Sequence, residues 1–83
     1  MAQETQEELI DFVCRNFMIE RHEFELDKSL IDQGVIDSFG LVEISSYLRS
    51  EFAIAVEQRE MTRDNFGSIL KIVAFIERKL RHE

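Results

Sequence analysis

The sequence predicts a small all-α protein, on three observations. Apolar residues recur at helical spacing in three separate stretches, and no stretch shows the convincing alternation of a half-buried strand. The chain has no proline and only three glycines, so few positions interrupt a helix. Its charged residues, 33% of the total, are interspersed as in small helical bundles. With 83 residues we expect a single domain, residues 1–83, whose small core gives a thin margin of stability.

A first helix is expected from about Thr5 to Met18. Thr5 and Glu8 have the spacing of a capping box, in which two side chains satisfy free backbone N–H groups at a helix start. The apolar stripe of this helix consists of Leu9, Ile10, Val13, Cys14 and Phe17.

Residues 20–37 are expected to form a long connection. A connection of this length is unusual in so small a domain and is often functional. Its turn-forming residues are Asp27, Ser29, Asp32 and Gly34. Its apolar residues, which suggest that it is pinned to the bundle, are Phe24, Leu26, Leu30, Ile31, Val35 and Ile36.

A second helix is expected from Ser38 to about Phe52. Its core face consists of Leu41, Ile44, Ser45, Leu48 and Phe52. At about 100° per residue, other side chains fall on the opposite side, namely Phe39, Val42, Glu43, Ser46 and Ser50. Apolar residues beside an acid suit a transient docking surface. The alternative is that Phe39 and Val42 pack under the long connection.

The remaining third of the chain is expected to hold two more helices. Residues 52–56 are the best strand candidate, but a loop that docks Ile54 and Val56 fits an all-α bundle better. A short helix is weakly indicated at about Glu60 to Asn65, and a last helix runs from about Gly67 to Leu80. The stripe of the last helix consists of Ile69, Ile72, Val73, Ile76 and Leu80.

Composition narrows the cellular setting and the partners. The net charge of −7 disfavours nucleic acid and anionic membranes and favours basic partner surfaces. Cys14 is the only cysteine, which fits a reducing compartment. The N-terminal residues lack an apolar signal region, and no apolar run is long enough to span a bilayer. We therefore expect a cytoplasmic, monomeric protein without membrane insertion, whose partners are enzymes with basic surfaces.

Catalytic and metal sites find little support in the sequence. His22 and His82 lie in polar surroundings near the ends of segments, and no nucleophile or metal spacing accompanies them. A glycine-rich phosphate loop and a dinucleotide motif are both missing. We expect that the protein is not an enzyme and binds no metal.

Ser38 is the candidate functional residue, in the run Gly34-Val35-Ile36-Asp37-Ser38-Phe39-Gly40-Leu41-Val42-Glu43. No base accompanies it, so a role as a catalytic nucleophile is remote. A hydroxyl at a helix start can instead carry a covalent phosphate-linked group, since the helix N-terminus favours a phosphate ester. Taken locally, Ser38 is also compatible with a simple N-cap in a non-carrier helical interaction module.

The chain resembles the acyl carrier protein family over nearly its whole length. The resemblance rests on Asp37-Ser38 together with its flanks, in order and at the right spacing. These flanks are the acidic first helix, Ser29-Leu30-Ile31-Asp32, Phe39 to Ile44, Phe52, the Ile54 and Val56 pair, Asp64-Asn65-Phe66 and the final helix. The resemblance implies a four-helix bundle with a long first loop and a short third helix.

The resemblance also implies a function. A phosphopantetheinyl transferase would move 4′-phosphopantetheine from coenzyme A onto Ser38, and the thiol of that arm would hold acyl or aminoacyl groups as thioesters. A loading ligase and downstream enzymes would recognise Asp37, Phe39, Val42, Glu43 and Ser46. Cys14 is then most simply a small core residue.

Several positions differ from many fatty-acid carriers. Gly40 stands where an acid is common, Ser45 and Ser46 stand where apolar residues are common, and Arg49 interrupts the second helix. These differences favour a specialised stand-alone carrier, such as the D-alanyl type, over a general fatty-acid role.

Overall fold

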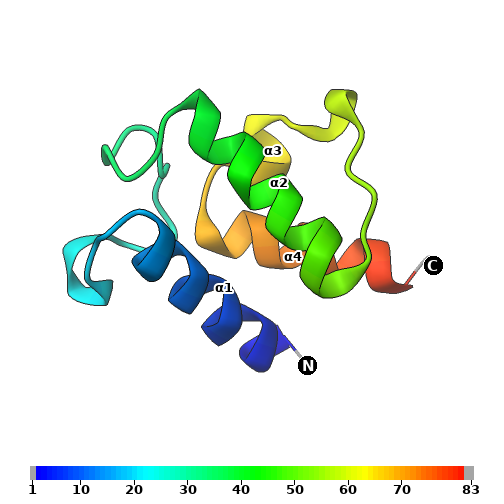
Figure 1. Ribbon diagram of the computed structural model, residues 1–83, viewed down its shortest axis with the longest axis horizontal. Coiled ribbons are helices and arrows are strands. Elements are labelled where there is room, and N and C mark those ends of the chain that lie inside the picture. Colours follow the sequence, from blue (N-terminus) through cyan, green and yellow to red (C-terminus); the bar gives the residue numbers. More distant parts are fainter. Residues whose placement is uncertain (1, 82–83) are drawn as a thin grey trace.

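The computed structural model describes residues 2–81, which form four α-helices (Figure 1). They are α1 (Ala2–Asn16), α2 (Ser38–Phe52), α3 (Arg63–Phe66) and α4 (Ile69–Arg81). Two short 3₁₀ turns, η1 (Arg21–Glu23) and η2 (Gln58–Glu60), interrupt the connections. No strand occurs within residues 2–81. The predicted all-α fold, with a long first loop and a short third helix, is confirmed.

Helix α1 begins earlier than its sequence suggests. It starts at Ala2, so Thr5 lies inside the helix, where it is 6% exposed. The expected capping box of Thr5 and Glu8 is therefore wrong, because a residue one turn into a helix has helical backbone and cannot act as its N-cap. The helix ends at Asn16. Two residues later, Met18 has a left-handed backbone conformation, with φ 55°, which changes the direction of the chain after the helix.

The core lies where α1 and α4 pack against each other and against one face of α2. Phe75 of α4 is 1% exposed and its ring lies 5.2 Å from that of Phe66, although it falls outside the expected stripe. Leu80, expected in that stripe, is 44% exposed, so its assignment to the core is wrong. The fully buried aliphatic side chains are Leu9, Ile10, Val13, Leu30, Ile44, Leu48, Ile54, Ile69, Ile72 and Ile76.

Backbone hydrogen bonds fix the long connection to the junction of α3 and α4. The N–H of Leu30 donates to the carbonyl of Gly67 at 2.9 Å, and the N–H of Leu70 donates to the carbonyl of Leu26 at 3.2 Å. Four of the six expected anchors are buried, namely Phe24, Leu30, Val35 and Ile36. Leu26 is partly buried, whereas Ile31 is 43% exposed and does not act as an anchor. The connection is therefore a fixed part of the bundle.

The segment after α2 is a loop that docks on the core. Ala53 ends α2 in the left-handed conformation, with φ 56°, and its N–H donates to carbonyls of the last turn. Ile54 is fully buried and Val56 is partly buried, as expected of a docking loop. The short third helix, α3, begins three residues later than predicted, because η2 occupies the expected start.

Candidate functional site

Ser38 is the first residue of α2, and its side chain is exposed. The residue that caps the helix is Asp37, whose backbone is extended and whose Oδ1 accepts a hydrogen bond from the N–H of Gly40 at 3.0 Å. The interpretation of Ser38 as the N-cap is therefore wrong. No described residue forms a hydrogen bond with Ser38 Oγ, so the hydroxyl has no structural task in the part of the chain that the structure covers.

Gly40 allows two other segments to approach the first turn of α2. A Cβ at Gly40 would lie 2.7 Å from Cβ of Ile36 and 3.2 Å from Cε1 of Phe17. Real Cβ atoms do not approach so closely, so only glycine permits this packing. Gly40 is one of the positions at which the sequence differs from many fatty-acid carriers, and a glycine inside a helical pattern indicates such a close approach. Gly40 thus holds the end of α1 and the end of the connection against the turn that carries Ser38.

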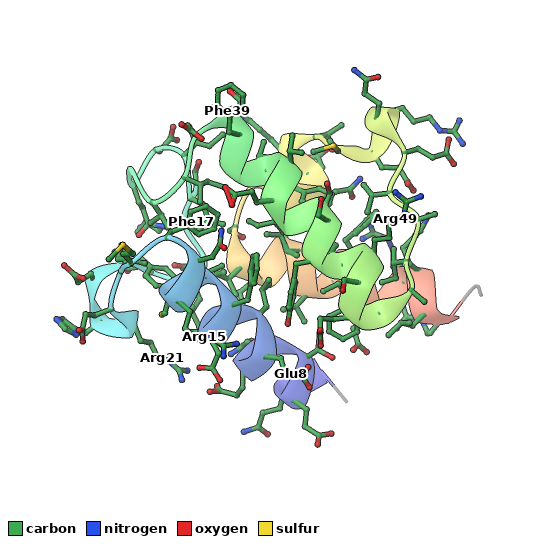
Figure 2. The ribbon with its side chains drawn as sticks, in the orientation of Figure 1. Glu8, Arg15, Phe17, Arg21, Phe39 and Arg49 are labelled. Atoms are coloured by element: carbon green, nitrogen blue, oxygen red, sulfur yellow. The ribbon has the colours of Figure 1, made fainter. Side chains whose placement is uncertain are left out.

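The expected recognition residues all lie on the exposed side of α2. Phe39 is 79% exposed and Val42 is 54% exposed, so the alternative that they pack under the connection is wrong. Figure 2 shows Phe39 projecting from the start of the helix. Asp37, Glu43 and Ser46 are exposed as well. The structure thus brings two apolar side chains and two carboxylates together around Ser38.

Glu43 makes a contact that the sequence does not reveal. Its Oε2 accepts a hydrogen bond from Nδ2 of Asn16, at the end of α1, at 2.8 Å. The two residues are 27 positions apart, so no local pattern joins them. The bond directs one oxygen of the carboxylate toward α1.

An open hollow lies next to Ser38, beside Glu43. It is lined by Phe17, Gly34, Val35, Ile36, Asp37, Phe39 and Glu43.

A second hollow, of about 120 Å³, lies on the other side of the α2 start. Leu41 of α2 contributes to it, together with residues of the long connection and of the region of α3. Its walls are mostly apolar. The lining residues are Ser29, Ile31, Leu41, Met61, Thr62, Arg63, Phe66 and Gly67.

The remaining reactive side chains lie away from Ser38. Cys14 is half-buried on α1, and burial raises the pKa of its thiol, as expected for a packed residue rather than a reactive one. His22 is exposed in η1, and His82 lies outside the described residues. Within residues 2–81, no cluster of His, Cys, Asp and Glu has the arrangement of a metal site. The structure therefore surrounds Ser38 with contact residues and places no general base there.

A helical bundle that exposes an unengaged serine at a helix start has the features of a carrier domain. The family model described as "Phosphopantetheine attachment site" matches residues 7–76. The chain is also 39% identical over 77 residues to the D-alanyl carrier proteins of Streptococcus pyogenes serotypes M5 (strain Manfredo), M49 (strain NZ131) and M1. These alignments cover 93% of this chain and 95% of each relative. The chain belongs to the phosphopantetheine attachment family.

Family membership confirms the predicted class of function. The protein is a carrier rather than an enzyme, and it holds acyl or aminoacyl groups on a covalently attached 4′-phosphopantetheine. Membership also implies interaction with the transferase that adds this group and with ligases that load it. No helix within the described residues is both long enough and apolar enough to cross a membrane.

Proposed function

We propose that Ser38 carries the 4′-phosphopantetheine. The observation that carries this proposal is the division of labour at the start of α2, where Asp37 caps the helix and leaves the neighbouring hydroxyl exposed and unengaged. Ser38 lies inside the matched segment, residues 7–76. An exposed hydroxyl held on a rigid helical turn is what a modifying enzyme needs.

The residues around Ser38 suit a phosphodiester. Ser38 Oγ forms the new bond to phosphorus, its proton passes to the transferase, and the nucleotide part of coenzyme A leaves. The first turn of a helix has free backbone N–H groups and the positive end of the helix dipole, both of which stabilise a phosphate there. Gly40 fixes this turn against Ile36 and Phe17, so the attachment point has a defined direction. When bound, the group supplies the thiol that holds the cargo.

The exposed side of α2 is the proposed recognition surface, formed by Asp37, Phe39, Val42, Glu43 and Ser46. Phe39 and Val42 offer apolar contact area, while Asp37 and Glu43 attract basic enzymes. The net charge of −7 adds long-range attraction to the same partners and repels nucleic acid.

In this proposal residues 1–83 act as one carrier domain, a monomer in the cytoplasm. A separate adenylate-forming ligase loads a small acyl or aminoacyl group onto the arm. The relatives named for D-alanine make that aminoacyl group one candidate cargo.

Modification by a promiscuous phosphopantetheinyl transferase tests the proposal. Incubation with coenzyme A should add one phosphopantetheine mass to the wild type, and Ser38→Ala should abolish the addition. Ser46→Ala is the matched control, because Ser46 is also exposed on α2, and it should be modified as the wild type is. A folded wild type that stays unmodified, or a Ser38→Ala variant that is still modified, would refute the assignment.

A second measurement separates this proposal from a non-carrier interaction module. Partner enzymes should act on the modified wild type and not on Ser38→Ala. Partner binding that is equally strong with Ser38→Ala and without any prosthetic group would favour the interaction module instead.

A further inference from the structure

A third hollow, of about 110 Å³, lies between the second half of α2 and the loop that follows it. Its walls are formed by Ser45, Ser46 and Arg49 on one side and by Ala55 and Val56 on the other. Figure 2 shows Arg49 on the side of α2 that faces this loop. The hollow thus combines two hydroxyls and a guanidinium with a small apolar wall.

Arg49 is an unpaired cation in an acidic protein. Its side chain forms no ion pair or hydrogen bond with any of residues 2–81, whereas the guanidinium of Arg21 pairs with Glu7 at 2.7 Å and the ammonium of Lys79 with Glu60 at 3.1 Å. The Ser45 hydroxyl donates to the carbonyl of Val42 at 2.8 Å. The five N–H donors of a guanidinium match a carboxylate, which accepts two parallel hydrogen bonds. The polar wall of the hollow is therefore suited to a carboxylate.

The hollow lies on the same face of α2 as Ser38. Ser45 and Arg49 follow Ser38 by 7 and 11 residues, which places all three within about 20° of one line along the helix at about 100° per residue. At 1.5 Å per residue they lie about 10 and 16 Å further along the axis. The phosphopantetheine arm has about 13 bonds from phosphorus to sulfur, which span roughly 16 Å at the reach of an extended chain.

We propose that this hollow receives the free carboxylate of a short dicarboxylic acyl group carried on the arm. The inference rests on the proposed attachment at Ser38 and narrows the class of cargo. Arg49 and the Ser46 hydroxyl bind the carboxylate, because the Ser45 hydroxyl already donates to Val42, and the methylenes of the cargo lie against Ala55 and Val56. The ammonium of a D-alanyl thioester is repelled by Arg49, so the hollow selects against that cargo. A hollow of about 110 Å³ suits a cargo of a few carbon atoms.

The test uses full-length protein modified with three hydrolysis-resistant pantetheine analogues, in which an amide replaces the thioester. The analogues carry glutaryl, pentanoyl and D-alanyl groups, and mass spectrometry verifies each product. In ¹H–¹⁵N spectra, the glutaryl form should shift the amides of Ser45, Ser46 and Val56 and the Nε–H of Arg49. The pentanoyl and D-alanyl forms should give shifts that are smaller by about two- to fivefold. This is the ratio of bound populations that a partly exposed ion pair produces, and the shifts follow the bound population.

Two variants identify the group that is responsible. Arg49→Gln should reduce the glutaryl shifts at Ser45 and Ser46 to the pentanoyl level, and Arg49→Lys should retain part of them because the charge remains. The matched control is Arg59→Gln, which removes an exposed arginine outside the hollow and should leave the shifts unchanged.

The outcomes separate this inference from the proposed function. If no phosphopantetheine mass is added, the attachment at Ser38 fails and the inference fails with it. If the mass is added but glutaryl and pentanoyl forms give equal shifts, or Arg49→Gln leaves the glutaryl shifts unchanged, only the inference is overturned.

Discussion

Helices α2 and α4 have similar lengths, 15 and 13 residues, but they use their apolar side chains differently. α4 buries five residues, namely Ile69, Ile72, Val73, Phe75 and Ile76. α2 buries only Gly40, Ile44 and Leu48 and leaves Phe39 and Val42 largely exposed. Burying a large apolar side chain stabilises a fold by about 1.5–3 kcal/mol, so exposed ones contribute little to folding. The outer face of α2 therefore adds little to the stability of the fold and is free for the contacts proposed above.

The serines at the two helix starts show the same division. Ser68 precedes α4, is 3% exposed, and its Oγ accepts a hydrogen bond from the N–H of Lys71 at 3.2 Å. Ser38 starts α2, is exposed, and leaves the capping task to Asp37. One serine stabilises its helix, while the other is available for chemistry.

The largest expected difference between the helices is between their phenylalanines. Phe75→Ala should lower the free energy of unfolding by about 3–5 kcal/mol, since it leaves a cavity in the core. Phe39→Ala should change it by less than about 0.5 kcal/mol, because the side chain is exposed. Urea unfolding followed by circular dichroism measures both values. Equal losses would remove the distinction between a structural α4 and a functional α2 surface.

Gly40→Ala tests the close approach on the inner face of α2. The added methyl group meets Cβ of Ile36 at 2.7 Å, and overpacking of this kind costs about 1–3 kcal/mol. The better helix propensity of alanine, worth about 1 kcal/mol, offsets part of this cost. Thermal unfolding should show a lower Tm than wild type. A Tm equal to or above that of wild type would mean that the first turn is not tightly packed.

Glu43→Lys tests the outer face. It should lower kcat/KM of the transferase or the loading ligase by about tenfold, or ~1.4 kcal/mol, because attraction to a basic surface becomes repulsion. Stability should change much less, since Glu43 is exposed. Asn16→Ala is the matched control, because it removes the 2.8 Å hydrogen bond to Glu43 and keeps the carboxylate. Unchanged partner kinetics with a large loss of stability would make Glu43 a structural residue.

The two helix-start serines should respond in opposite ways to the same substitution. Ser68→Ala should cost about 1 kcal/mol of unfolding free energy, as expected for loss of an N-cap. Ser38→Ala should cost less than about 0.5 kcal/mol, because Asp37 still caps α2. Chemical denaturation of the unmodified proteins compares them directly, and a larger loss for Ser38 would restore a capping role.

The smallest effect concerns the charged end of α4. A backbone hydrogen bond from Glu57, and then Lys79, hold the pKa of Glu60 below its ordinary value of 4.5. The unfolded state therefore binds protons more readily, so this contribution is present above about pH 4.5 and is lost as the pH falls through the folded-state pKa. Glu60→Gln should cost less than about 1 kcal/mol near pH 7 and progressively less toward pH 3.

The matched control for this pH dependence is Glu25→Gln, which alters an exposed carboxylate without an ion pair among residues 2–81. Unfolding free energies measured across this pH range should show no comparable change for the control. A Glu60→Gln cost that does not depend on pH would contradict the linkage.

Local patterns in the sequence predicted most of the fold. The helical stripes placed α2 and α4 within a few residues, because the spacing of apolar residues depends only on helix geometry. Helix boundaries were less accurate. Thr5 has the chemistry of a cap, but α1 begins three residues before it, at Ala2, and Thr5 is buried at 6% exposure.

The sequence by itself determined the helices, the acidic character and the serine run from Asp37 to Glu43, because these depend on residue type and local spacing. Only the tertiary structure decided which residues serve the core and which serve the surface. It buried Phe75, exposed Leu80, required glycine at position 40 and joined Asn16 to Glu43. These outcomes depend on contacts between segments far apart in the chain, and no local periodicity encodes such contacts.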